Sequence, residues 1–188
     1  MKNQKSLLPV YLLSVLLLIV SCKKDDPVIP NEEELITTLV YTLTPVAGGE
    51  PAVFTFTDTD GAGGAAPVVV NDTLTANTAY LGSLQLLDET VSPPDDISAE
   101  ITDEAEAHQF FFAAEAGLNA TVTYADFDGN GRPLGLANTL TTGNVSEGGL
   151  TITLRHEPDK AAAGVADGNI ANAGGETDIE VQFTVKVQ

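Results

Sequence analysis

The chain has 188 residues, a formal net charge of −19 at pH 7 and a hydrophobic content of 43%. This length suits one domain with its own core. The excess of acidic residues argues against nucleic acids and anionic lipid surfaces as partners, because like charges repel. Cys22 is the only cysteine, so no disulfide can form within the chain.

The first 21 residues have the plan of a lipoprotein signal peptide. Lys2 and Lys5 precede an apolar run over residues 6–20. At about fifteen residues this run is shorter than the ~20 that a membrane-spanning helix needs. It ends in Ile19-Val20-Ser21-Cys22, which resembles the lipobox of bacterial lipoproteins. The resemblance implies cleavage before Cys22 and acylation of its thiol. A chance cysteine in a signal peptide cut elsewhere, or a buried thiol, is the alternative.

Residues 22–33 are expected to form a flexible acidic tether, since they offer little apolar surface to bury. Lys23-Lys24-Asp25-Asp26 resembles the surface-export signal of Bacteroidota lipoproteins, although a solvated charge run is an alternative interpretation. Taken together, the chain resembles the small β-rich envelope lipoproteins of Bacteroidota. That resemblance implies a protein anchored through Cys22 to the bilayer of the cell outer membrane and exposed on either its inner or its outer face.

Residues 34–188 are expected to form one all-β domain, an antiparallel β-sandwich of immunoglobulin-like type. The clearest strand is 179–187, whose odd-numbered apolar residues should face the core. Residues 99–107 are compatible with a short helix. Other segments with the alternation and composition of strands are 39–43, 53–57, 80–87, 108–112, 118–124 and 150–154.

His108 and His156 are the only histidines, and each stands at one end of a predicted strand. Strand ends can meet in a sandwich, so the two imidazoles are candidates for one transition-metal site, with a carboxylate from Glu106 or Glu157. Such donors suit zinc or copper. The alternative is two histidines that bond only to carboxylates or water.

Asp126, Asp128 and Asn130 alternate just before Gly131, a pattern that suits calcium, which takes six to eight oxygen ligands. The first half resembles the calcium loop of EF-hands and dockerins. The twelfth position departs from that pattern, because Ala137 stands where a bidentate Glu is expected. The alternative is that these residues only form a hairpin turn.

The chain carries no recognised catalytic signature, and we expect a non-enzymatic binding or structural protein without a cofactor, calcium being the alternative. Its partner would be an unidentified protein or glycan. A metal-handling protein is the second hypothesis. A hydrolase using the carboxylates of Asp126, Asp128, Glu106 or Glu157 is the third.

Thr73, in Asp72-Thr73-Leu74, resembles an O-glycosylation acceptor of exported Bacteroidota proteins.

Overall fold

The computed structural model describes residues 34–61 and 63–188. The predicted signal peptide, Cys22 and the tether 22–33 lie outside the described residues. Glu33–Gln188 form one compact unit. Because every described strand and all of the buried core belong to this unit, a chain starting at Lys23 contains what the domain needs to fold.

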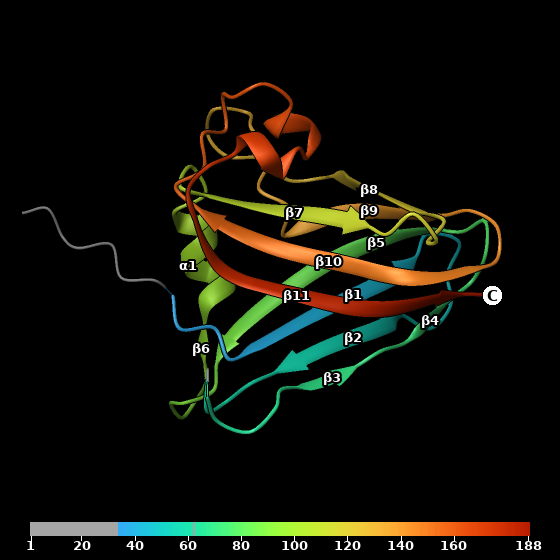
Figure 1. Ribbon diagram of the computed structural model, residues 1–188, viewed down its shortest axis with the longest axis horizontal. Coiled ribbons are helices and arrows are strands. Elements are labelled where there is room, and N and C mark those ends of the chain that lie inside the picture. The colour runs from blue at the N-terminus through green and yellow to red at the C-terminus, as the bar shows by residue number, and fades with distance from the viewer. Residues whose placement is uncertain (1–33, 62) are drawn as a thin grey trace, which may run out of the picture. The chain divides into compact units, whose positions relative to one another are not determined.

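Two sheets pack face to face in this unit (Figure 1). The seven-stranded sheet has the order β3-β2-β1-β5-β9-β8, with β6 paired to β5, and the four-stranded sheet has the order β4-β11-β10-β7. The strands of the larger sheet are β1 (Thr38–Pro45), β2 (Ala52–Thr57), β3 (Val68–Val70), β5 (Ala79–Asp88), β6 (Asp95–Asp96), β8 (Ala120–Tyr124) and β9 (Ala137–Thr142). Those of the smaller sheet are β4 (Thr73–Leu74), β7 (His108–Ala114), β10 (Ser146–His156) and β11 (Glu176–Val187).

Strand pairs are antiparallel except for the parallel pair of β4 and β11. The predicted all-β antiparallel sandwich is therefore confirmed, while its immunoglobulin-like type stays a prediction. All seven predicted strands are present, with ends that differ by a few residues.

The core lies between the sheets and follows from the alternation in the strands. In β11 every odd-numbered residue from Ile179 to Val187 is buried and the even-numbered residues between them are exposed. Phe183 of β11 contacts Phe54 of β2 across the core, with ring centroids 5.6 Å apart. Burying one such side chain contributes about 1.5 to 3 kcal/mol to the stability of the folded domain. The face of β11 that carries the odd-numbered apolar residues is therefore the face that packs against the core.

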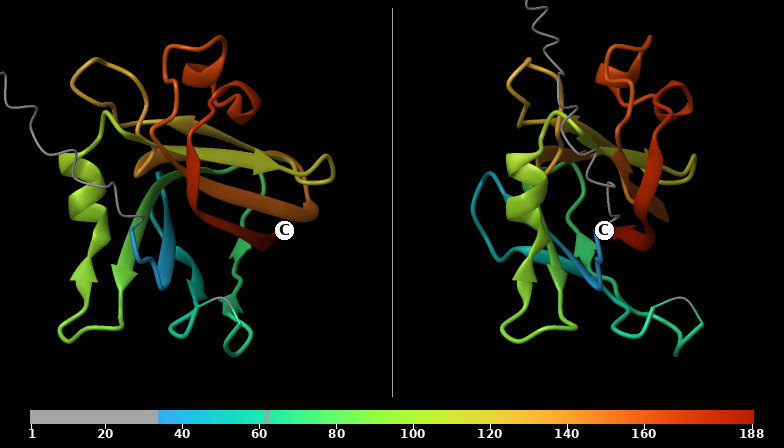
Figure 2. Two further views of the ribbon diagram at one scale, coloured as in Figure 1. Left: turned by 60° about the vertical axis from the view of Figure 1, so that its left-hand side comes forward. Right: turned by 90° about the vertical axis from the view of Figure 1, so that its left-hand side faces the viewer.

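A helix and a long connection complete the domain. The helix α1 (Ile97–Asp103) begins after Asp96, whose carboxylate accepts the Ser98 amide, and it buries Ile97 and Ile101. It stands at the end of the sandwich where β7 begins (Figure 2). Between β10 and β11 the chain forms two 3-10 helices, η1 (Val165–Asp167) and η2 (Ile170–Asn172), and Val165 packs on Phe111 of β7.

Candidate metal centre

The two histidines lie side by side at one end of the smaller sheet. β7 begins at His108, β10 ends at His156, and the antiparallel register pairs these two residues directly. Their ring centroids are 4.4 Å apart, and both side chains are buried. The structure thus brings together the two imidazoles that the sequence singled out.

The carboxylates in this cluster are those of Glu34 and Asp178. His108 Nε2 lies 3.0 Å from Glu34 Oε1 and 3.9 Å from Asp178 Oδ2, and His156 Nδ1 lies 3.6 Å from one oxygen of each acid. The suggested partners Glu106 and Glu157 are not members of the cluster. Both are exposed, and Glu106 instead lies beside Gly129.

A β-bulge brings Asp178 into the cluster. The pairing of β10 with β11 shifts between Leu154, opposite Ile179, and Arg155, opposite Thr177, so Asp178 is the additional residue. A bulge of this kind changes the direction of a side chain. The side chain of Asp178 is fully buried, whereas the later even-numbered side chains of β11 face solvent.

Two features of the backbone bring Glu34 and the start of β11 close to the histidines. Glu34 directly precedes the segment that enters β1, which joins the sheet where the Thr37 amide donates to the Leu87 carbonyl. Gly175 has φ +70°, and a Cβ there would clash with the carbonyl oxygen of His156. Only glycine therefore lets the chain pass this close to His156 before β11 begins.

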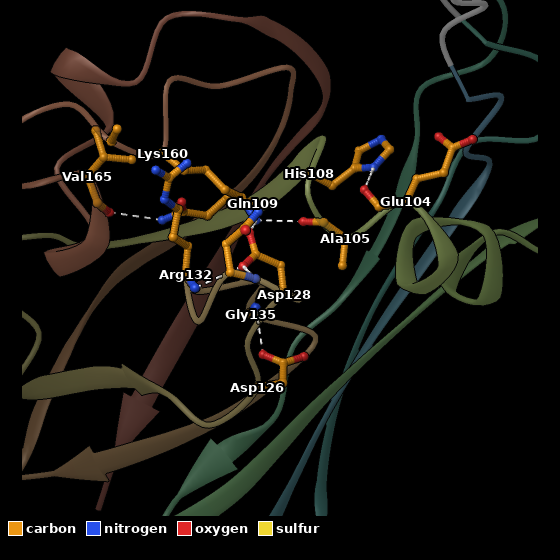
Figure 3. Close-up of polar contacts among 12 residues, drawn as sticks. Glu104, Ala105, His108, Gln109, Asp126, Asp128, Arg132, Gly135, Lys160 and Val165 are labelled. Carbon is orange, nitrogen blue, oxygen red and sulfur yellow. Dashed lines mark hydrogen bonds and ion pairs between the residues drawn. The ribbon is translucent and has the colours of Figure 1, made fainter.

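The protonation of His108 is fixed on one side of the ring. Nδ1 lies 3.2 Å from the Glu104 carbonyl oxygen just after α1 (Figure 3), and because a carbonyl only accepts, Nδ1 carries a hydrogen. In the neutral imidazole, Nε2 then directs its lone pair at the Glu34 oxygen 3.0 Å away. Two such acceptors repel unless a proton or a metal ion lies between them. Histidines that bind metals usually donate their other N–H to a carbonyl or carboxylate in this way.

The spacing of the four groups matches a metal site. Their ligand atoms all lie within 4.8 Å of one another. A tetrahedral zinc site with bonds near 2.0 to 2.1 Å places its ligand atoms about 3.3 Å apart. The nearest histidine–carboxylate distances here are 3.0 to 3.9 Å, with each histidine facing a different oxygen of each acid.

The charges of the cluster also fit a divalent ion. Two carboxylates and one divalent ion are neutral together, which relieves the cost of burying two negative charges among neutral imidazoles. Two nitrogens and two oxygens suit zinc or copper, whereas calcium prefers oxygen ligands alone. The competing arrangement is an ion-pair cluster with protonated histidines.

The acidic turn singled out for calcium is occupied by other hydrogen bonds (Figure 3). The two oxygens of Asp126 accept the amides of Gly135 and Ala137 at 2.7 and 2.9 Å. Asp128 accepts two amides of the turn through Oδ1, those of Asn130 and Arg132, and the Lys160 ammonium through Oδ2 at 3.0 Å.

Asp128 and Lys160 form a buried ion pair. Burial alone would raise the pKa of Asp128, but the Arg132 amide, Lys160 and the Asn130 amide outweigh it and hold the pKa below its usual range. Burial lowers the pKa of Lys160, against the opposing effect of Asp128. Lys160 thus supplies a positive charge beside Asp128, where calcium would have to bind. This geometry favours the hairpin-turn interpretation over calcium binding or carboxylate hydrolysis.

Thr73 opens the short strand β4 and is half-buried, with its amide bonded to the side chain of Asp72 at 2.7 Å. Its glycosylation stays a prediction.

Comparisons of the chain with protein-family models, curated proteins and solved structures give no match. No helix among the described residues is long and apolar enough to cross a membrane. Fold and site together define an all-β sandwich with a buried cluster of two histidines and two carboxylates at one end.

Proposed function

We propose that this chain is a metal-binding protein of the cell envelope, in which Glu34, His108, His156 and Asp178 hold one zinc or copper ion. The observation that supports it best is the convergence of these four buried side chains, whose ligand atoms lie within 4.8 Å of one another. Two of them are histidines, so the cluster is more than a gathering of acids.

The expected role of the ion is structural or storage-related, not catalytic. Structural zinc sites have four protein ligands, while catalytic sites keep one position open for water or substrate. The four side chains here offer four ligand atoms, the number that a tetrahedral structural site needs. They come from β7, β10, β11 and the segment before β1, so a bound ion would join all four at one end of the sandwich.

The proposed location rests on residues 1–26 alone. The apolar run and Ile19-Val20-Ser21-Cys22 support a lipoprotein anchored through acyl chains on Cys22 in the outer membrane. Growth of the producing bacterium with an alkyne-tagged fatty acid tests this. We expect label on the wild-type protein and none on Cys22→Ser, and an unlabelled wild-type protein would contradict the anchor.

The metal site is tested by the melting temperature of the chain 23–188, first in EDTA and then with zinc, copper or calcium. At a metal concentration about 100 times Kd, binding stabilises the folded state by about 2.7 kcal/mol, a rise of about 5 to 10 °C for a domain of this size. We expect that rise with zinc or copper and none with calcium.

Variants assign the rise to the cluster. His156→Asn should abolish it, while the exposed acids Glu106→Gln and Glu157→Gln serve as matched controls and should retain it. No rise with zinc or copper would mean that the four residues form only an ion-pair cluster, and that result would refute the proposal.

A further inference from the structure

We propose that the bound metal fixes residues 34–36 to the domain through Glu34, and that loss of the metal releases this segment; the inference rests on the proposed metal site. Glu34 differs from the other three ligands in its place in the chain. His108, His156 and Asp178 belong to strands of one sheet, whereas Glu34 precedes β1.

Few other contacts hold this segment. Among the described residues, the first backbone hydrogen bond along the chain is that of Thr37 to Leu87. Leu35 is 57% exposed, and only Ile36 packs partly against the core. The carboxylate of Glu34, 3.0 Å from His108 Nε2, is therefore the main polar attachment of residues 34–36 within the described chain.

Removal of a divalent ion makes the net charge of the cluster more negative. It takes two positive charges away from the carboxylates of Glu34 and Asp178, which lie close together in a buried place, and this is unfavourable. Asp178 is held between Thr177 and Ile179, which both pair with β10. Glu34 has no such restraint and can turn its charge into water. His108, His156 and Asp178 remain as a three-ligand site that still binds zinc, with a lower affinity.

The segment immediately follows the predicted tether. A metal-dependent attachment at Glu34 would therefore set the point at which the chain leaves the domain toward Cys22. Release would lengthen the free chain between the membrane anchor and β1 by three residues, or about 10 Å when extended. The metal content of the surroundings would then change the reach of the displayed domain.

The test uses a nitroxide label at residue 35 in the chain 23–188, which lacks Cys22, so that Leu35→Cys supplies the only thiol. Zinc is diamagnetic, and electron paramagnetic resonance reports the label's mobility with EDTA and with zinc. A matched label at Val145→Cys, which is 71% exposed, lies just before β10 starts, about 36 Å along the strand from His156. Calorimetry measures zinc binding separately.

We expect zinc to slow the label at residue 35 several-fold and to leave the label at residue 145 unchanged. In Glu34→Gln, zinc should still bind, but more weakly by at least the roughly 10- to 100-fold that loss of a partner supporting a ligand costs, and the label at residue 35 should stay mobile at saturating zinc. Zinc binding with no change at residue 35, or an unaltered response in Glu34→Gln, would overturn the metal-dependent attachment while leaving the metal site intact. Absence of zinc binding to the wild-type chain would instead refute the proposed function itself.

Discussion

The turn at Asp128 and the metal cluster both contain buried carboxylates, and they balance the negative charge in different ways. The turn at Asp128 balances it with Lys160, whose ammonium lies 3.0 Å from the carboxylate, and with two backbone amides. The metal cluster pairs Glu34 and Asp178 with histidines, which can be neutral and can donate lone pairs to a metal.

The difference separates a structural ion pair from a candidate binding site. The carboxylate of Asp128 meets donors that belong to the chain itself, so folding alone satisfies it. In the cluster, His108 has one nitrogen committed to the Glu104 carbonyl and directs the other at Glu34. A buried carboxylate is therefore informative about metal binding only when the identity of its neighbours is known.

The largest expected effect comes from breaking the ion pair of the turn. Lys160→Met should destabilise the domain by about 3 to 5 kcal/mol, because it leaves the Asp128 charge buried without its ammonium partner. Urea unfolding of the chain 23–188 at pH 7 measures this loss. Zinc should still raise the melting temperature of the variant, since Lys160 is not a ligand.

The double variant Asp128→Asn/Lys160→Met is the control for that prediction. Removing both charges should restore much of the stability, because the cost in the single variant comes mainly from the isolated charge. If calcium raised the stability of the wild-type domain and Asp128→Asn lost that rise, the turn would be an ion site and the contrast between the two regions would fail.

A smaller effect on stability is expected from a substitution at Gly175, where the backbone passes close to His156. Gly175→Ala places a Cβ against the His156 carbonyl at a left-handed φ, which alone costs about 1 to 2 kcal/mol. Displacement of His156 should also weaken zinc binding about tenfold or more, as loss of ligand orientation does in other sites. Gly174→Ala is a matched control, because a Cβ there has the same left-handed strain and nothing within 4 Å. Equal zinc affinities in the two variants would contradict the positioning role.

Much of the fold was predictable because several strands alternate between apolar and polar residues, most regularly over residues 179–187. β11 and β10 carry branched and aromatic residues on one face, and these were located from the sequence. β9 was missed, since Leu140 is its only large apolar residue. The other two buried residues of β9 are polar: Asn138 accepts from the Tyr41 hydroxyl of β1, and Thr142 donates to the carbonyls of Thr75 and Thr78 just before β5. The two- and three-residue strands β3, β4 and β6 are too short to show a period.

The candidate site was predictable only in part. Two rare histidines at strand ends indicated a shared position, which the pairing of β7 with β10 provides. Asp178 was hidden because the later even-numbered residues of its strand face solvent, and only the bulge turns its side chain inward. Glu34 was hidden in an acidic run, where nothing local distinguishes it from Glu32 and Glu33.

The smallest expected effect is a pH dependence that belongs to the turn and not to the metal cluster. Because the folded pKa of Asp128 lies below its unfolded value, its contribution to stability is fully present above the unfolded pKa, near 4. It is lost as the pH falls further through the folded pKa. Urea unfolding from pH 7 to pH 3, in EDTA to keep metals out, should show a steeper loss for the wild type than for Asp128→Asn. The other carboxylates titrate in both proteins, so the difference isolates Asp128. If the free energy of unfolding fell equally with pH in both proteins, Lys160 and the turn amides would not favour the ionised carboxylate of Asp128. The contact between Asp128 and Lys160 would then contribute through packing and not through charge.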